Sequence, residues 1–437
     1  MDINTILSNF KIETLNEMQL AALVAIPKPN DVVLISPTGT GKTLAFLLPM
    51  LPLIKMDSQR VQVLIVVPTR ELAQQIENVF KQMSTGIKIN CCYGGHAVKI
   101  EKNNLQHPPA ILIGTPGRIA YHIGNKNFET SAIHTLILDE FDKSLEAGFD
   151  EEMSYIIGEL KGLYKRVLTS ATALNEIPAF VGIKNKVEVN FSVAKSKPNP
   201  SLQIKVVRAT GMEKLDALML LISKLGHQSK IVFCNHRDAV DRISEQLLEL
   251  GVEHGFYHGG LDQMEREKTL IKLRNGSTRL LITTDLAARG LDIPEIEAII
   301  HYQLPTTEDI MIHRNGRTAR MNAEGTAYFM LEEKDHQPKF LHVIPGNMPL
   351  PLKFKLPLAP EWKTLYIAAG KKDKINKMDV VGMLLQKGKL AKEDLGKIEV
   401  LDHATYAAVK RNKINATVAI IRNEKIKNRK IKMEVAN

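Results

Sequence analysis

Cysteine is scarce in this sequence, and the three cysteines form no redox or metal-binding motif. Cys91 and Cys92 are adjacent, Cys234 lies far downstream, and no CxxC spacing occurs. This usage is typical of a reducing compartment, where thiols stay unpaired. The 13 histidines also lack ligand spacings. We therefore expect structural cysteines, no zinc site and no metal catalysis through histidine.

Long hydrophobic runs are also missing. No apolar run approaches the roughly 20 residues that a membrane-spanning helix needs. The first ten residues, MDINTILSNF, lack the basic and apolar regions of a signal peptide. Both absences predict a soluble protein of the cytoplasm.

Acidic residues are too few to balance the basic ones at one end of the chain. The net charge is +10, and residues 361–437 hold 18 Lys and Arg against 9 Asp and Glu, which leaves 40 against 39 elsewhere. Such a segment attracts a polyanion, or it is only a solubilising tail. Charge alone does not choose between RNA, DNA and anionic lipid.

Short apolar runs alternate with helical stretches along most of the chain, which is the βαβ rhythm of a parallel sheet. The rhythm stops at residues 192–201 and restarts beyond them, and residues 344–362 contain five prolines. The fold class is therefore α/β. Two parallel-sheet domains are expected at 1–194 and 202–345, and a small α+β domain at 362–437, whose βαββαβ element order predicts an RRM-like fold.

The string SPTGTGKT, residues 36–43, follows a predicted strand and resembles a phosphate-binding P-loop. Gly39 and Gly41 let backbone N–H groups face the phosphates, Lys42 reaches the β- and γ-phosphates, and Thr43 offers a hydroxyl to Mg²⁺. Ser36 stands where the strict pattern has glycine.

Two further strings complete an ATP-hydrolysing site. In TLILDEFD, Asp139 would hold Mg²⁺ and Glu140 would orient and deprotonate water, although such a pair alone is usually a solvated helix start. In HRNGRTAR, Arg317 and Arg320 are one helical turn apart and would point at one phosphate, unless they form a basic surface of weak ion pairs.

Together these strings resemble the DEAD-box family of superfamily 2 RNA helicases over residues 1–345, in the family's order. The resemblance implies two RecA-like domains, with ATP and Mg²⁺ as cofactors and RNA as partner. The matching strings are SPTGTGKT (motif I), PTRELA (Ia), Gly94-Gly95 (GG), TPGR (Ib), DEFD (II), SAT (III), VFCN (IV), HGGLDQMER, TTDLAARGLDI (V) and HRNGRTAR (VI).

The resemblance also implies roles. Gln19 would read adenine, Asp292 would touch the ribose, and Ser170, Thr172 and His313 would couple hydrolysis to strand separation. The expected nucleotide-binding residues are Gln19, Thr38, Gly39, Thr40, Gly41, Lys42, Thr43 and Asp292, and the expected RNA contacts of the core are Thr69, Arg70, Gly95, Thr115, Arg118, Gln263, Arg266 and Thr284.

Three departures from the family pattern occur. Phe141 replaces the alanine of DEAD, the Q motif reads LNEMQ (residues 15–19) with little chain before it, and Ala319 stands where motif VI usually has glycine. Upstream of the Q motif, no clear match is found for the aromatic that stacks on adenine in the family. Adenine selectivity therefore rests on fewer residues than hydrolysis does.

The basic tail resembles the RNA-binding domain of DbpA-type bacterial helicases over residues 362–435. This implies anchoring on ribosomal RNA and a role in ribosome assembly. Its predicted strands hold only Tyr366 and Tyr406 as aromatics. We therefore expect RNA contacts from the basic residues Lys371, Lys372, Arg411 and Lys430.

Two alternatives stay open. A DNA helicase of the same superfamily shares motifs I, II and VI, and an ATP-locked RNA clamp would bind RNA with little turnover. The Gln19 region, the SAT string and the RRM-like tail favour RNA. Intact Glu140, Arg317 and Arg320 favour turnover. The expected mechanism is closure of both RecA-like domains on ATP and RNA.

Overall fold

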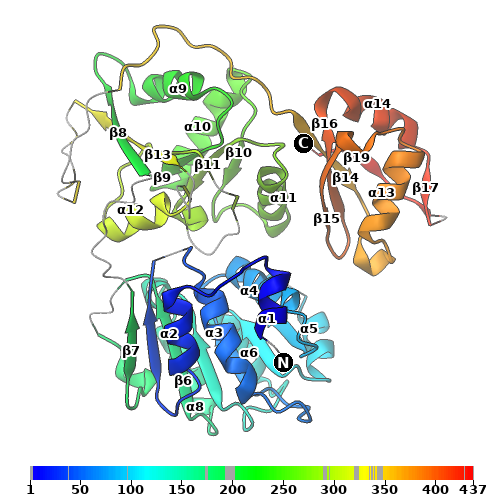
Figure 1. Ribbon diagram of the computed structural model, residues 1–437. Helices are drawn as coiled ribbons and strands as arrows, with labels where there is room; N and C mark the ends of the chain where they lie inside the picture. Colours follow the sequence, from blue (N-terminus) through cyan, green and yellow to red (C-terminus); the bar gives the residue numbers. More distant parts are fainter. Residues whose placement is uncertain are drawn as a thin grey trace. The chain divides into compact units, whose positions relative to one another are not determined.

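The computed structural model describes residues 3–37, 39–95, 97–172, 176–191, 202–288, 293–294, 296–318, 324–333, 335, 338, 340–341, 348–427 and 429–436. These residues form two compact units, one ending at residue 191 and one starting at residue 202 (Figure 1). Within the described ranges, no helix is both long enough and apolar enough to cross a membrane.

The first unit is built on a seven-stranded parallel sheet with the order β3-β4-β2-β5-β6-β1-β7. Its strands are β1 Val32–Ile35, β2 Val63–Val66, β3 Ile89–Cys92, β4 Ile111–Gly114, β5 Thr135–Leu138, β6 Lys165–Ser170 and β7 Val187–Asn190. Its helices are α1 Ile3–Asn9, α2 Glu17–Ala25, α3 Lys42–Met50, α4 Arg70–Gln82, α5 Val98–Leu105, α6 Pro116–Gly124, α7 Phe141–Glu146 and α8 Asp150–Glu159.

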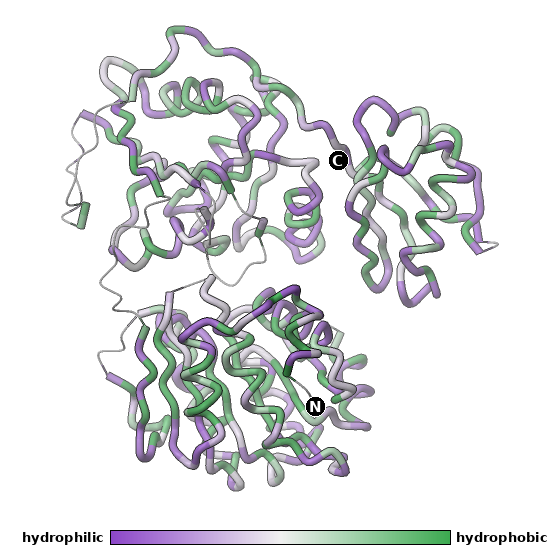
Figure 2. The backbone as a smooth tube through the Cα atoms, viewed as in Figure 1, coloured by the Kyte–Doolittle hydropathy of each residue, from purple (hydrophilic) through white to green (hydrophobic). Residues whose placement is uncertain are grey.

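The strands of this sheet are apolar on both faces, because each face packs on helices. Along β1, Val32 and Leu34 join the hydrophobic cluster that contains α2, α3 and α4, whereas Val33 and Ile35 join the cluster that contains α6 and α8. Figure 2 shows the apolar character of these central strands. The continuous apolar runs in the sequence are therefore strands buried between two helical layers.

The second unit contains a six-stranded parallel sheet with the order β10-β11-β9-β12-β13-β8. Its strands are β8 Leu202–Ala209, β9 Lys230–Cys234, β10 Gly255–Tyr257, β11 Leu280–Thr284, β12 Ala298–His301 and β13 Gly325–Glu332, and its helices are α9 Lys214–Leu225, α10 Arg237–Glu249, α11 Gln263–Arg274 and α12 Glu308–Asn315. The two predicted parallel-sheet domains are thus confirmed.

The C-terminal part of the second unit has its own antiparallel sheet and its own core. The predicted βαββαβ order is confirmed, with a β-hairpin added before the last strand. The sheet order β15-β16-β14-β19 places the first and third strands of the motif in the centre. The elements are β14 Trp362–Ile367, α13 Lys377–Gln386, β15 Leu395–Val400, β16 Thr405–Lys410, α14 Arg411–Ile421, β17 Lys425–Ile426, β18 Arg429–Lys430 and β19 Met433–Val435.

One face of this antiparallel sheet contacts the end of α11 and the loop that follows it. Arg274 forms two hydrogen bonds with the carboxylate of Glu399, at 3.0 and 2.7 Å. Next to this pair, the Asn275 amide donates to the Thr364 hydroxyl at 3.0 Å, and both residues are buried. The C-terminal sheet therefore has a covered face.

Candidate functional site

The carboxyl ends of β5, β6 and β1 bring three predicted motifs to one edge of the first sheet. Ile35 pairs with Ser170 in the parallel register of β1 and β6, so Ser36 begins where β6 ends. Asp139 follows the last residue of β5, the next strand on the other side of β6. Parallel α/β sheets bind ligands at this edge.

The P-loop has the backbone that close approach to phosphate requires. Gly39 and Gly41 have φ of +82° and +85°, and Gly41 is the N-cap of α3. Lys42, the first residue of that helix, is 9% exposed, and its ammonium donates to carbonyl oxygens of the loop, including that of Pro37 at 3.3 Å. The helix N-terminus and this ammonium together favour an anion.

The residues of the Q motif support the P-loop directly. Asn16 and Gln19 form a capping box at the start of α2. Their side-chain amides then reach the loop, where Asn16 donates to the Thr40 carbonyl at 2.9 Å and Gln19 donates to the Gly41 carbonyl at 3.3 Å. Gln19, which is predicted to recognise adenine, therefore also stabilises the P-loop.

Asp139 is a buried carboxylate held by neutral donors. It is 3% exposed, and its Oδ1 accepts hydrogen bonds from the Thr169 hydroxyl and from the Glu140 N–H. Burial raises the pKa of Asp139, although the Thr169 hydrogen bond and the charge of Lys42 oppose this shift. A divalent cation would favour the charged form of this carboxyl, so the site fits Mg²⁺.

Glu140 lies in a left-handed backbone conformation, with φ of +49°, directly before α7. Its N–H also contacts the Thr169 hydroxyl at 3.2 Å. Ser170, which follows Thr169 at the end of β6, donates from its Oγ to the Thr172 carbonyl at 2.7 Å. Thr169 thus links the Asp-Glu pair to the strand that carries the SAT motif.

The neighbouring strands carry the predicted RNA contacts of the first unit at the same edge. Thr69 caps α4 after β2, and its hydroxyl accepts from the Leu72 N–H at 3.2 Å. Arg70 begins that helix and packs against Gly95, where a Cβ would lie 2.5 Å from the guanidinium. Gly95 has φ of +89°. Motif Ia and the GG motif are therefore in direct contact.

The TPGR residues open α6 after β4. Thr115 is the N-cap and Pro116 is the first helical residue, a position that needs no N–H donor. Arg118 lies in the first turn with its side chain 15% exposed, and its Nε is 3.5 Å from the buried Glu101 carboxylate. Its predicted RNA-binding role stays a prediction.

In the second unit, Arg314 is fully buried and joins three motifs. Its guanidinium bonds to both oxygens of Asp285, to the Gln303 carbonyl at 2.8 Å and to the Asn235 side chain at 2.7 Å. It also lies over the ring of Phe233 at 5.2 Å. This first arginine of HRNGRTAR is therefore a structural connection between motifs IV, V and VI.

The helical spacing expected for Arg317 and Arg320 is wrong at its first residue. Helix α12 ends at Asn315, so Arg317 lies in the turn that follows, where its carbonyl accepts from the Ile296 N–H at 3.2 Å. Gly316 caps the helix and ends it. Arg317 is 5% exposed, and His313, on the helix itself, is 2% exposed.

The remaining predicted RNA contacts of the second unit lie on two elements. Gln263 begins α11 after the capping residue Asp262, and Arg266 lies one turn later and is buried. Thr284 is the last residue of β11, the strand that pairs with β9. Thr38, Asp292 and Arg320 lie outside the described residues.

Three of the four basic residues predicted in the tail lie close together. Lys371 and Lys372 precede Asp373, whose carboxylate pairs with Arg429 at 3.9 Å, and Arg429 is next to Lys430. These lysines are exposed. We call Lys371, Lys372, Arg429 and Lys430 the basic edge.

Arg411 lies elsewhere. Its guanidinium forms two hydrogen bonds with Glu253 and another with the Pro360 carbonyl, so it already has a protein counterion.

The two tyrosines belong to the covered face of the C-terminal sheet. Tyr366 and Tyr406 are cross-strand partners with ring centroids 5.4 Å apart. Burial raises the pKa of Tyr406 to about 12, with further contributions from Tyr366 and from Glu267 of α11. Base stacking on this face, as in usual RRMs, is therefore disfavoured.

Sequence reasoning missed Asn16, Thr169 and Arg314 as functional supports. Asn16 directly precedes a helix, and asparagine is a favoured N-cap residue, so the sequence does indicate its capping role. Thr169 and Arg314 gave no signal of their own, because their partners come from distant parts of the chain.

Comparison with known families gives three matches, each inside one predicted domain. Residues 16–179 match the DEAD/DEAH box helicase family, residues 213–322 match the helicase conserved C-terminal domain, and residues 364–435 match the DbpA RNA binding domain.

Individual relatives agree with these matches. The ATP-dependent RNA helicase DbpA of Escherichia coli is 32% identical and covers 91% of this chain and 89% of its own length. DbpA of Bacillus subtilis is 28% identical, with 96% and 94% covered. The structure of Saccharomyces cerevisiae Dbp5 bound to RNA and ADP BeF3 has a TM-score of 0.67 at 26% identity, covering 76% of this chain and 88% of that one. This chain therefore belongs to the DEAD-box RNA helicases of the DbpA type, which are RNA-stimulated ATPases.

Proposed function

We propose that this chain hydrolyses ATP to unwind or remodel short RNA duplexes, acting in the cytoplasm on structured ribosomal RNA during ribosome assembly. The observation that supports the proposal is the distribution of the predicted nucleotide and RNA motifs along one edge of the sheet in the first unit. The P-loop follows β1, the Asp-Glu pair follows β5 and the SAT motif ends β6, whereas motif Ia follows β2, the GG motif follows β3 and motif Ib follows β4. One rigid sheet thus supports both the nucleotide and the RNA.

In this proposal, Lys42 binds the β- and γ-phosphates, and Thr43 and Asp139 hold Mg²⁺, which when bound stabilises charge on the phosphoryl group. Glu140 orients and deprotonates the attacking water. Arg317 and Arg320 supply positive charge to the transferred phosphoryl group. Gln19 and Asp292 recognise adenosine, and Ser170, Thr172 and His313 couple hydrolysis to RNA remodelling.

The RNA contacts of the core are proposed to reach phosphates and sugars, so the core is indifferent to base sequence. They are Thr69, Arg70, Gly95, Thr115, Arg118, Gln263, Arg266 and Thr284.

Target choice is assigned to the C-terminal domain. The exposed lysines of the basic edge suit a phosphate backbone better than Arg411 does, because Arg411 is paired with Glu253. The covered position of Tyr366 and Tyr406 supports the same assignment.

A multiple-turnover ATPase assay tests the catalytic part. Glu140→Gln keeps the size of the side chain but removes the base, so turnover with saturating RNA should fall by roughly 10²- to 10⁴-fold. Glu146→Gln, at the end of the short helix α7 that Glu140 precedes, is the matched control, because Glu146 pairs with Lys143 and is half exposed. Hydrolysis at the parent rate by Glu140→Gln contradicts the proposal.

A second assay tests the substrate. RNA should stimulate the ATPase, single-stranded DNA should not, and a short labelled duplex joined to a ribosomal RNA fragment should be displaced faster than one joined to an unrelated RNA. Equal stimulation by DNA would indicate a DNA translocase. ATP-dependent RNA binding with less than one turnover would indicate a clamp.

A further inference from the structure

His258 lies directly after β10, the strand at one edge of the six-stranded sheet in the second unit. It opens the loop of residues 258–262, which leads to α11 and its first residue, Gln263. Strand β10 has three residues and, among the described strands, pairs with β11 alone. A short edge strand fixes the chain that follows it weakly, so this loop depends on side chains for its position.

The His258 side chain holds the loop from inside the fold. It is 6% exposed, and its ring stacks on that of Phe256 with centroids 5.8 Å apart. The Gly260 N–H donates to Nδ1 at 3.1 Å, so the ring proton is on Nε2. From Nε2 the ring donates to Oδ1 of Asp241 on α10 at 3.0 Å. One ring nitrogen therefore contacts the loop and the other contacts the helix behind it.

The two glycines of the loop, Gly259 and Gly260, are both exposed but have different surroundings. A Cβ at Gly260 would lie 3.1 Å from Nδ1 and Cε1 of His258, so the backbone packs directly against the ring. A Cβ at Gly259 would meet no atom of the described residues within 4 Å, its chain neighbours left aside. One side of the loop is therefore fitted to His258, and the other side is open.

The loop lies between two predicted RNA contacts of the second unit. At its start, Tyr257 pairs with Thr283, whose hydroxyl donates to the Tyr257 carbonyl at 2.7 Å. Thr284, a predicted RNA contact, is the next residue of β11. At its end, Gln263, another predicted contact, begins α11. A displacement of the loop would therefore move Gln263 relative to Thr284.

We propose that His258 is a positioning residue for RNA binding by the second RecA-like domain. Its hydrogen bond to Gly260 fixes the loop, and its hydrogen bond to Asp241 fixes the ring. The RNA backbone then meets a loop that is already ordered, which lowers the entropic cost of binding. This inference rests on the proposed RNA roles of Gln263 and Thr284.

Two conservative variants of the full chain separate the two hydrogen bonds of the ring. In His258→Asn, the side-chain oxygen takes the place of Nδ1 and still accepts from Gly260, but it does not reach Asp241. In His258→Gln, the amide nitrogen takes the place of Nε2 and still donates to Asp241, but Gly260 loses its acceptor.

The RNA concentration for half-maximal ATPase stimulation should rise about tenfold in His258→Gln, equivalent to about 1.4 kcal/mol, and less than about threefold in His258→Asn. The turnover number at saturating RNA and the KM for ATP should stay within about twofold in both variants. A role in packing alone would give the opposite order, because glutamine is closer than asparagine to histidine in volume.

His254→Gln is the matched control. His254 lies directly before β10, donates from Nδ1 to the Val252 carbonyl at 2.8 Å, and accepts from the hydroxyl of Ser244 on α10 at 2.7 Å. It therefore links the same helix to the opposite, amino end of the same strand. Its loss should lower the melting temperature and leave the RNA concentration for half-maximal stimulation within about twofold.

Three results would overturn the inference: an equal rise in His254→Gln, tighter RNA binding by His258→Gln than by His258→Asn, or a parallel fall of RNA affinity, ATP affinity and melting temperature in His258→Gln. Lack of RNA stimulation in the parent protein would instead contradict the proposed function. Fluorescence anisotropy of a labelled single-stranded RNA with a non-hydrolysable ATP analogue would then rank the variants and decide the role of His258.

Discussion

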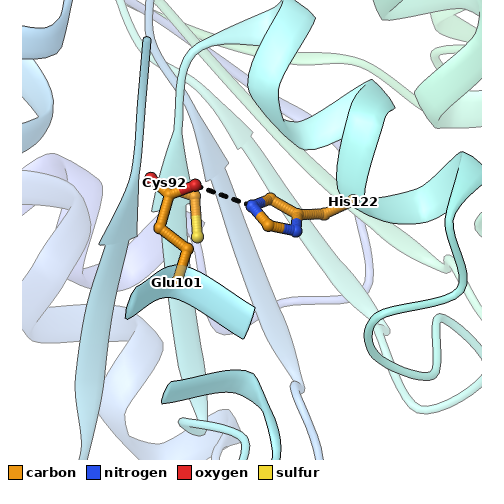
Figure 3. Close-up of side chains that lie close together, drawn as sticks. All are labelled: Cys92, Glu101 and His122. Atoms are coloured by element: carbon orange, nitrogen blue, oxygen red, sulfur yellow. Dashed lines mark hydrogen bonds and ion pairs between the residues drawn. The ribbon is translucent and has the colours of Figure 1, made fainter. Parts of the chain in front are cut away.

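The two halves of the carboxyl edge of the first sheet each contain a buried carboxylate, but the two carboxylates have different partners. Asp139 lies in the half that carries the predicted nucleotide motifs. It accepts from the Thr169 hydroxyl and a backbone N–H, and burial raises its pKa. Glu101 lies in the half that carries the predicted RNA contacts, and it has His122 as a donor (Figure 3) and the guanidinium of Arg118 nearby.

This difference in hydrogen-bond and charge partners distinguishes two environments of a buried carboxylate. A carboxylate that accepts its hydrogen bonds from neutral donors, and whose pKa stays raised despite the nearby charge of Lys42, suits a cation that arrives with a ligand. A carboxylate beside a protein guanidinium already has a charged partner within the protein. The partners of a buried acid therefore indicate whether it still suits an added cation.

Asp139→Asn should produce the largest effect among the variants that distinguish the two halves of the sheet edge. The amide keeps the size of the side chain but cannot hold Mg²⁺, so ATP turnover should fall by roughly 10²- to 10³-fold. The melting temperature without nucleotide should rise by about 2 to 4 °C, because a disfavoured charge has been removed. Thermal unfolding and steady-state ATPase assays measure both, and a lower melting temperature would contradict the assigned pKa direction.

The stabilisation by Asp139→Asn should also depend on pH. The pKa of Asp139 in the folded state is raised above the unfolded value of about 3.9, so the folded protein loses stability as pH rises from the unfolded pKa to the folded pKa, and the loss is complete above the folded pKa. The difference between parent and variant should therefore be present at neutral pH and vanish near pH 4. A difference that does not change with pH would mean that the charge is not its cause.

Thr169→Val should lower ATP turnover less than Asp139→Asn does, although it changes the same half of the sheet edge. Valine keeps the volume but removes the hydroxyl that contacts Asp139 and the Glu140 N–H, so both acids lose their alignment. We expect turnover to fall about 10- to 100-fold, with little change in RNA affinity. An equal loss of RNA affinity would show that the two halves are not independent.

Gly41→Ala should affect ATP alone. The position has φ of +85°, and a Cβ would lie 2.5 Å from the Gln19 amide that braces the loop. A left-handed alanine costs roughly 1 to 2 kcal/mol, so the KM for ATP should rise about tenfold. Gly158→Ala on α8, where a Cβ meets nothing within 4 Å, is the control.

Gly95→Ala is the matching change at the RNA half and should have the smallest effect. A Cβ at this position would lie 2.5 Å from the Arg70 guanidinium, whose long side chain can move aside. We expect the RNA concentration for half-maximal stimulation to rise about fivefold, with the KM for ATP unchanged. A shift in ATP affinity as large as that of Gly41→Ala would contradict the division of the edge.

Most of the fold could be predicted from the sequence, because its signals are local and repeated. Apolar runs such as that of β1 alternate with helices, and Gly41 and Lys42 directly after β1 mark the phosphate loop. The βαββαβ order of the C-terminal domain could also be predicted from the sequence.

What could not be predicted depends on side chains that meet across the fold. Nothing in the sequence shows that Thr169 reaches Asp139, that Arg314 is buried or that Arg411 pairs with Glu253. The end of α12 at Asn315 was also missed, because a short basic string does not show where a helix stops. The domain boundaries at 1–194, 202–345 and 362–437 remain predictions.

The backbone of Glu140 carries a consequence for how this sequence can change. Its left-handed conformation is one that glycine adopts freely and that other residues rarely adopt. Substitution by glycine would therefore relax the chain while removing the carboxylate. A selection for thermal stability alone would favour losing this side chain, and only a selection for turnover would keep it.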